Sequence, residues 1–191
     1  FATDDGVLHV FRTRVDENTG KKDYFELAYP GISLLGFNQD EGEEWRDTAA
    51  SLRDDGVSSE GKLELTALGW LLGDATILVG DSYGGIQAWS PVREYDDDNN
   101  ARYRRIRALP SGSGAIAGFC SAQASKSFLA WDQSGRLRGI YNTSEREFFD
   151  AKLDQPAAYC IYSPKGDGAM AIDTTGKSHL WWVDLKHAEV S

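Results

Sequence analysis

Four arginines stand close together and form the most suggestive cluster for chemistry: Arg102, Arg104, Arg105 and Arg107. Side chains alternate along an extended strand, so Arg105 and Arg107 would share one face and Arg102 and Arg104 the other. Guanidinium groups bind phosphate and carboxylate, which makes this basic strand a candidate anion-binding site. The alternative is an exposed outermost strand whose charges block pairing with other chains.

A run of acidic and amide residues at positions 96–100 places oxygen ligands at alternate positions, as a calcium loop does. The rest of the calcium pattern fails. Ala101 stands where the turn glycine belongs, and Arg107 stands where the bidentate glutamate belongs. We therefore expect a solvated hairpin tip here and no metal.

Residues typical of catalysis are few and scattered. The histidines are His9, His179 and His187, and the first two fall in equivalent strands of a repeat, which explains them without catalysis. Ser113 is preceded at two residues by Ser111, so it does not fit the Gly-x-Ser-x-Gly nucleophile turn. The sequence therefore predicts no catalytic residue, no cofactor and no enzyme.

A recurring Asp-x-x-Gly motif shows which elements would position these residues. Glycine supplies positive φ without steric cost, and the short aspartate side chain can bind turn amides, so the motif predicts hairpins between strands. Apolar runs precede each motif, and alternating residues follow it. The motif residues are Asp81 and Gly84, Asp132 and Gly135, and Asp173 and Gly176.

The spacing of these glycines, 51 and then 41 residues, is typical of a β-propeller with four strands per repeat. Complete blades are predicted from strands at 63–71, 76–80, 85–92 and 103–109, and at 115–121, 127–132, 136–142 and 146–153. A last blade has strands at 157–162, 168–172 and 177–184 and lacks its fourth. Strands at 7–15 and 23–28 would begin the arc.

The expected fold class is therefore all-β, a partial β-propeller of about three to four four-stranded antiparallel blades. We expect one domain over residues 1–191, with a charged loop insertion at 38–61. Natural propellers close with about four to eight blades. An open arc exposes strand edges, so pairing with a second copy would be the simplest way to close the ring.

Net charge and composition exclude some classes of function. The net charge is −10, from 20 basic and 30 acidic residues, which argues against a nucleic-acid partner. Apolar runs are too short to span a membrane, and the first residues lack signal-peptide features. Those residues resemble the middle of a strand instead, so we expect the chain to be a piece of a longer polypeptide.

Cysteines and tryptophans are expected to serve packing. Cys120 and Cys160 lie in apolar runs, which favours buried free thiols; a disulfide in an oxidising compartment is the alternative. The tryptophans of the repeats are expected to pack between blades rather than to form a ligand cage. They are Trp70, Trp89, Trp131, Trp181 and Trp182.

Two segments carry a resemblance to a known family. They are residues 78–93 (LVGDSYGGIQAWSPVR) and residues 182–191 (WVDLKHAEVS). Both resemble parts of long-form, PstC-like permeases of phosphate ABC transporters, and the second is similar to the stretch that leads from the periplasmic domain of that family back toward the membrane. The turns also resemble WD40-like propellers, with 88–90 and 182–185 at the place of the WD dipeptide.

The resemblance implies a non-enzymatic periplasmic domain of a multi-pass protein of the bacterial inner membrane, joined to the membrane by flanking segments and contributing to phosphate uptake. The implied partners are the other transporter subunits and the periplasmic phosphate-binding protein, with a homodimer as a further expectation. The permeation residues of that family lie in its membrane part, so no site residue transfers to this chain. A free-standing WD40-like protein-interaction scaffold is the main alternative, and a propeller enzyme is the third.

Overall fold

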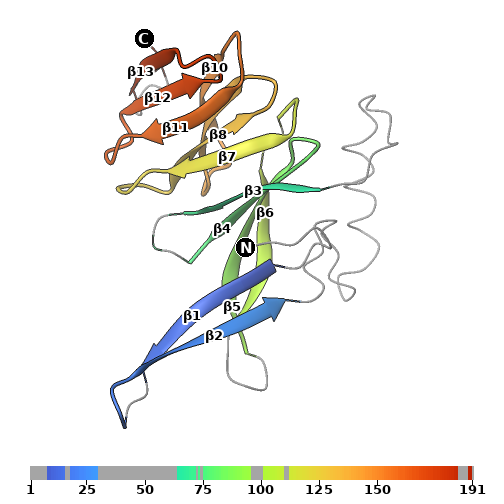
Figure 1. Ribbon diagram of the computed structural model, residues 1–191, viewed down its shortest axis with the longest axis vertical. Coiled ribbons are helices and arrows are strands. Elements are labelled where there is room, and N and C mark those ends of the chain that lie inside the picture. Colours follow the sequence, from blue (N-terminus) through green and yellow to red (C-terminus); the bar gives the residue numbers. More distant parts are fainter. Residues whose placement is uncertain are drawn as a thin grey trace. The chain divides into compact units, whose positions relative to one another are not determined.

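The computed structural model describes residues 8–15, 18–29, 64–71, 73, 75–95, 101–109, 112–184 and 189–190 (Figure 1). The regular elements in these ranges are all β-strands. The described residues contain no helix that is long and apolar enough to cross a membrane. The chain divides into two compact units, Phe1–Leu65 and Thr66–Ser191. The predicted insertion at 38–61 and the acidic run at 96–100 lie outside the described residues.

The first unit contains an antiparallel hairpin. Strand β1 (Leu8–Val15) pairs with β2 (Lys22–Tyr29) over its whole length, from Leu8 opposite Tyr29 to Val15 opposite Lys22. The strands predicted at 7–15 and 23–28 are thus present. Their place in an incomplete blade, and a single domain over 1–191, stay predictions.

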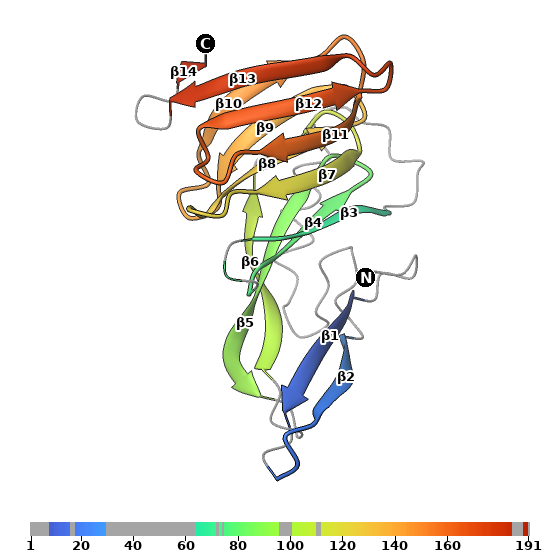
Figure 2. The ribbon, with the colours of Figure 1, turned by 60° about the vertical axis from the view of Figure 1, so that its left-hand side comes forward.

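Three four-stranded antiparallel sheets make up the second unit, and we call them blades 1, 2 and 3 (Figure 2). Blade 1 has β3 (Leu65–Trp70), β4 (Ile77–Asp81), β5 (Ile86–Tyr95) and β6 (Ala101–Leu109). Blade 2 has β7 (Ile116–Ser121), β8 (Ser127–Asp132), β9 (Arg136–Tyr141) and β10 (Glu147–Lys152). Blade 3 has β11 (Ala157–Tyr162), β12 (Gly168–Asp173), β13 (Ser178–Asp184) and β14 (Glu189–Val190). The predicted all-β class with propeller-like blades is confirmed.

Blade 3 corrects one prediction. Its fourth strand was expected to be missing, but β14 occupies that place and pairs with β13. The strand is only two residues long, and a pairing of this length leaves no periodic pattern in a sequence. Among the described residues, only Val183 and Asp184 of β13 pair with β14, whereas β9 of blade 2 pairs with β10 from Arg136 to Ile140.

The second strand of each blade is the most deeply buried. Every residue of β4 and of β8 is buried. A strand with both faces covered needs a continuous apolar run rather than an alternating one, which explains Ile77–Val79 and Phe128–Trp131. These runs therefore mark the interior of the stack of blades.

Two apolar clusters hold neighbouring blades together. Gly80 of blade 1 lies so close to blade 2 that a Cβ atom there would come within 2.6 Å of the Ile116 Cβ. Each large side chain buried in these clusters contributes about 1.5–3 kcal/mol. The cluster between blades 1 and 2 contains Leu71, Leu78, Ile86, Ala88, Leu109, Ile116, Phe128, Ala130 and Ile140. The cluster between blades 2 and 3 contains Ala122, Leu129, Trp131, Leu137, Phe148, Phe149, Leu153, Ala157, Cys160, Tyr162, Ala169, Ala171 and Val183.

Candidate functional site

The aspartates of the Asp-x-x-Gly motifs are committed to their own turns. In each turn, one carboxylate oxygen accepts hydrogen bonds from the backbone amides two and four residues later, at 2.8–3.0 Å. The pairs are Asp81 with Tyr83 and Gly85, Asp132 with Ser134 and Arg136, and Asp173 with Thr175 and Lys177. One oxygen of each carboxylate is therefore occupied by the amides of its own turn.

The turn glycines take the conformation for which glycine is favoured. Gly84, Gly135 and Gly176 have φ values of 84°, 88° and 86°, in the left-handed region. Each donates its amide to the carbonyl of the motif aspartate, at 2.9–3.2 Å. The three turns therefore share one backbone geometry.

Backbone hydrogen bonds clasp these turns to the loops that connect the blades. The carbonyls of Gly84 and Gly135 accept from the loop that follows their blade, and the residue after the motif aspartate donates to the loop that precedes its blade. The bonds are Gly112 N to Gly84 O (2.7 Å), Gln133 N to Ala115 O (2.9 Å), Leu153 N to Gly135 O (2.8 Å) and Thr174 N to Pro156 O (3.0 Å). We call this series the clasp ladder.

The backbone of β6 interrupts the spacing on which the predicted arginine cluster depends. Strand β6 carries an irregularity, because Arg107 lies opposite Ala88 and Arg105 lies opposite the next residue, Trp89. The strict alternation predicted to place Arg105 and Arg107 on one face is therefore interrupted. Of the four arginine side chains, only that of Arg107 lies within the described ones.

Arg107 forms an ion pair with Glu145, in the turn between β9 and β10. The pair links the outermost strand of blade 1 to blade 2. This geometry favours a structural role for Arg107 over the predicted anion site, and anion binding by Arg102, Arg104 and Arg105 stays a prediction.

Sequence reasoning missed a second charged group, on β9 and β10. Arg136 donates to both carboxylate oxygens of Asp150, at 2.8 and 2.9 Å. This hydrogen-bonded pair raises the pKa of Arg136 and lowers that of Asp150. Arg138 is only 1% exposed and lies 3.5 Å from Glu147; burial lowers the pKa of its guanidinium. In the sequence, this group could have been recognised from the arginines at alternate positions of one predicted strand, Arg136 and Arg138.

His179 serves the turn of blade 3. Its Nε2 lies 3.0 Å from Oδ2 of Asp173, and its ring stacks on that of Trp181. Hydrogen bonds from His179 and Thr175 hold the pKa of Asp173 well below its ordinary value. His9 lies on β1, and His187 lies outside the described residues. Within the described ranges, no three acidic, histidine or cysteine side chains gather as metal ligands would.

We expect the substitution Asp173→Asn to reduce the acid sensitivity of the fold. A carboxyl group whose pKa falls on folding contributes stability that is complete above its unfolded pKa, about 3.9, and is lost as the pH falls toward its folded pKa. The free energy of unfolding of the wild-type protein should therefore decrease as the pH is lowered below about 4, and that of the variant should decrease less. Urea unfolding at about pH 7 and about pH 3 measures the difference. Equal pH slopes for the two proteins would contradict this assignment.

Both cysteines are free thiols on neighbouring blades. Cys120 Sγ accepts a hydrogen bond from the Tyr162 amide at 3.3 Å. Burial raises the pKa of the Cys120 thiol and raises that of Cys160 to about 12. The thiolate is the reactive form, so both groups are protected in the folded chain.

A thiol reagent should therefore find Cys160 unreactive until the chain unfolds. Relative to a free cysteine, the thiolate fraction near neutral pH falls by about three orders of magnitude. Colorimetric titration should count few thiols in the native protein and two after denaturation without reductant. Rapid native labelling of Cys160, or a missing thiol after denaturation, would show that the arrangement is wrong.

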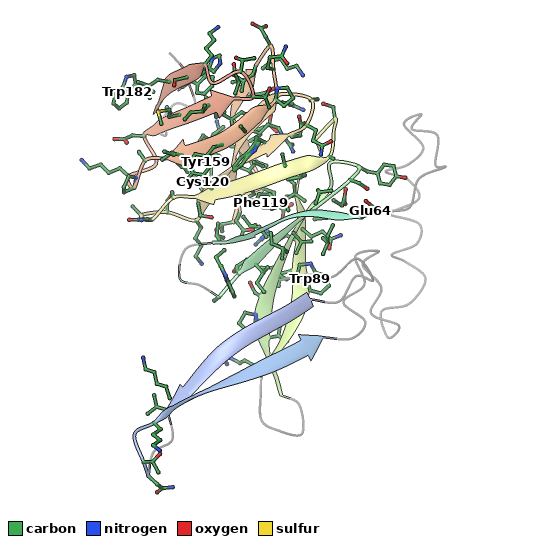
Figure 3. The ribbon with its side chains drawn as sticks, in the orientation of Figure 1. Glu64, Trp89, Phe119, Cys120, Tyr159 and Trp182 are labelled. Carbon is green, nitrogen blue, oxygen red and sulfur yellow. The ribbon has the colours of Figure 1, made fainter. Side chains whose placement is uncertain are left out.

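One face of blade 3 is apolar and exposed. The strand register places Tyr159 beside Ile172, and Ile161 beside Met170 and Leu180. Tyr159 is 58% exposed, Leu180 65% and Trp182 61%; Figure 3 labels Tyr159 and Trp182 on this blade. We call this surface the outer face of blade 3; it comprises Tyr159, Ile161, Met170, Ile172, Ser178, Leu180 and Trp182.

The equivalent face of blade 2 is an interface. The repeat spacing of 41 residues relates Met170, Ile172 and Ser178 of blade 3 to three residues of blade 2. These are Leu129, Trp131 and Leu137, which are buried against blade 3. In blade 1, a further 51 positions earlier, Leu78 and Ile86 are buried against blade 2. The outer face of blade 3 thus has the composition and position of a blade-to-blade interface.

The tryptophans divide into two groups. Trp89 and Trp131 are buried, and Trp181 packs edge-on against Phe149, with ring centroids 5.7 Å apart. Trp70 and Trp182 are exposed, so the prediction that all five pack between blades is wrong for these two. Each stands on a strand whose side chains alternate between covered and open faces, and the sequence does not show which face is covered.

Comparisons with known proteins support the fold and nothing finer. No protein-family model and no curated protein matches the sequence. Among solved structures, a WD40 propeller in "Crystal Structure of Mitotic Checkpoint Complex" superposes with a TM-score of 0.52 at 9% identity, covering 100% of this chain. The superposed region is 48% of the length of that WD40 chain. At this identity the likeness shows a partial WD40-like β-propeller fold alone.

Proposed function

We propose that this chain is a non-enzymatic protein-interaction domain. The observation that carries the proposal is the outer face of blade 3, where large apolar side chains stand exposed on a regular sheet. Contiguous apolar surface of this kind is typical of protein contacts. The polar groups that could do chemistry, such as Asp132, His179 and Arg107, are instead engaged in turns and ion pairs.

As a finer proposal, we place the domain in a phosphate ABC transporter, as a periplasmic accessory domain of a PstC-like permease. The support is the resemblance of residues 78–93 and 182–191 to that family. The first segment forms the hairpin of β4 and β5, and the second includes the end of β13 and β14. In this role the domain would contact the other transporter subunits and the periplasmic phosphate-binding protein.

Binding to the phosphate-binding protein tests this role. Biolayer interferometry with the purified 191-residue chain should give a dissociation constant of about 1–100 µM, the range of transient contacts. Millimolar phosphate alone should not shift the melting temperature of the chain, because a ligand of the folded state must stabilise it. No binding up to about 100 µM would reject the transporter role.

The alternative is a free-standing WD40-like scaffold, favoured by the likeness of the fold to a WD40 propeller. Under this alternative the chain would bind other proteins but not the phosphate-binding protein. The same interferometry experiment therefore separates the two.

A further inference from the structure

Two departures from regular backbone geometry, one in blade 1 and one in blade 2, meet in the ion pair of Arg107 with Glu145. The first is a bulge in β6. Consecutive residues of β5 lie opposite Arg107 and Arg105, so Ile106 is an extra residue in the ladder. Bulges commonly redirect a side chain. Leu109, on the same side of β6 as Arg107, is buried between blades 1 and 2, so Arg107 is directed toward blade 2.

The second departure is the backbone of Glu145. Among the described residues, it is the only one other than glycine with a positive φ, 58°. This left-handed region is unfavourable for a residue with a Cβ atom. Glu145 lies in the turn between β9 and β10, which the Tyr141 amide closes by donating to the Arg146 carbonyl at 2.9 Å. Such strain persists where the surrounding structure holds it, and outside its own turn Glu145 contacts Arg107.

The ion pair lies at the outer strands of the two blades. Strand β6 is the last strand of blade 1, and Glu145 lies in the turn that leads into the last strand of blade 2. Other polar bonds between these blades lie nearer their first strands. Ser121 Oγ of β7 donates to Trp70 O of β3, and Gly112 N donates to Gly84 O in the clasp ladder. A bond far from these contacts resists tilting of one blade against the other.

We propose that Arg107 and Glu145 form a latch that fixes the angle between blades 1 and 2. The Nε atom of Arg107 is buried, and the side chains of Arg107 and Glu145 are only 31% and 46% exposed, so solvent ions screen the pair incompletely. The attraction between the charges offsets the strain at Glu145. Release of the pair lets blade 1 separate from blade 2 at its outer strand. The latch does not depend on the partner named in the proposed function.

Amide hydrogen exchange followed by NMR on the full 191-residue chain tests the latch. In Glu145→Gln, the amides of blade 1 and the amide of Gly112 should exchange about 2–5-fold faster, the effect expected for a partly exposed ion pair. Exchange in β11–β13 should stay unchanged. Asp150→Asn is the matched control, because Asp150 is 50% exposed and forms its ion pair with Arg136 inside blade 2. Blade 1 of this control should exchange at the wild-type rate.

Sodium chloride at about 1 M provides an arm that uses the unmodified protein, in case a variant fails to fold. Salt at this concentration reduces the Debye length to about 3 Å, so it should accelerate exchange of the same blade 1 amides in the wild type. In Glu145→Gln, which lacks the pair, salt should add no further acceleration in blade 1.

The strain at Glu145 has its own test. Glu145→Ala and Glu145→Gly both lack the carboxylate, but only glycine is relaxed at this φ. The alanine variant should therefore have an unfolding equilibrium constant about 5–30-fold larger than that of the glycine variant. Equal constants would overturn the assignment of strain. Unchanged exchange in blade 1 of Glu145→Gln, equal acceleration by Asp150→Asn, or an equal response of the wild type and Glu145→Gln to salt would overturn the latch.

Discussion

Replacing Gly135 by alanine should destabilise the three-bladed unit by about 3 kcal/mol or more, one of the largest effects available to a single methyl group. Two costs combine. An alanine at φ 88° is strained, by about 1–2 kcal/mol. The added Cβ would also lie 2.8 Å from the Leu153 carbonyl oxygen, a backbone atom of the loop that follows blade 2. The loop would have to move away, and the clasp between Leu153 and Gly135 would weaken.

Gly176→Ala is the matched control for this effect. Gly176 has nearly the same φ, 86°, but a Cβ atom there would meet nothing within 4 Å. Its cost should therefore be the strain alone, about 1–2 kcal/mol. Urea unfolding of both variants isolates the contribution of the contact between turn and loop. Equal losses for the two alanines would show that this contact adds no stability.

The second large effect is expected from Asp132→Ala, which should lower the free energy of unfolding by about 3 kcal/mol. Asp132 is buried, and one of its oxygens accepts three hydrogen bonds, from the amide and hydroxyl of Ser134 and from the amide of Arg136. Alanine would remove the acceptor of these donors in a partly buried turn. The nearby guanidinium of Arg138 would also lose the favourable electrostatic contribution of this carboxylate.

Asp154→Ala removes an acidic side chain from an exposed position of blade 2's trailing loop and should cost less than about 0.5 kcal/mol. Asp132→Asn keeps an acceptor oxygen and should fall between the two substitutions. Denaturant unfolding at neutral pH ranks all three. An Asp132→Ala variant as stable as Asp154→Ala would show that the turn hydrogen bonds do not support the blade.

The turns and most strand boundaries could be predicted from sequence because their determinants are local. A glycine that needs positive φ, an aspartate that binds the amides two and four residues later, and an apolar run before them all fall within about ten residues. Strand β8, predicted at 127–132, has these bounds in the structure. The two residues of β14 carry no such pattern, and its pairing depends on tertiary context.

The contacts of the candidate site could not be predicted because they join distant residues. Arg107 and Glu145 are 38 residues apart and belong to different blades. The register shift in β6 lies between Arg105 and Arg107 and interrupts the alternation of faces along the strand. No residue type in this part of the sequence indicates such a shift. Exposure of Trp182 follows from which face of blade 3 has a neighbour, and that depends on the arrangement of whole sheets.

The clasp ladder has a consequence for how the unit opens. The turns of blades 1 and 2 are held by the loop that follows the blade, at Gly84 by Gly112 and at Gly135 by Leu153. Among the described residues, Gly176 of blade 3 has no corresponding bond. A stack whose units are stabilised mainly by their neighbours behaves as a one-dimensional chain and frays from its least supported end. Amide hydrogen exchange should therefore be fastest in blade 3 and slowest in blade 2. A protein bound to the outer face of blade 3 would act as an end cap, slowing exchange in residues that it does not touch.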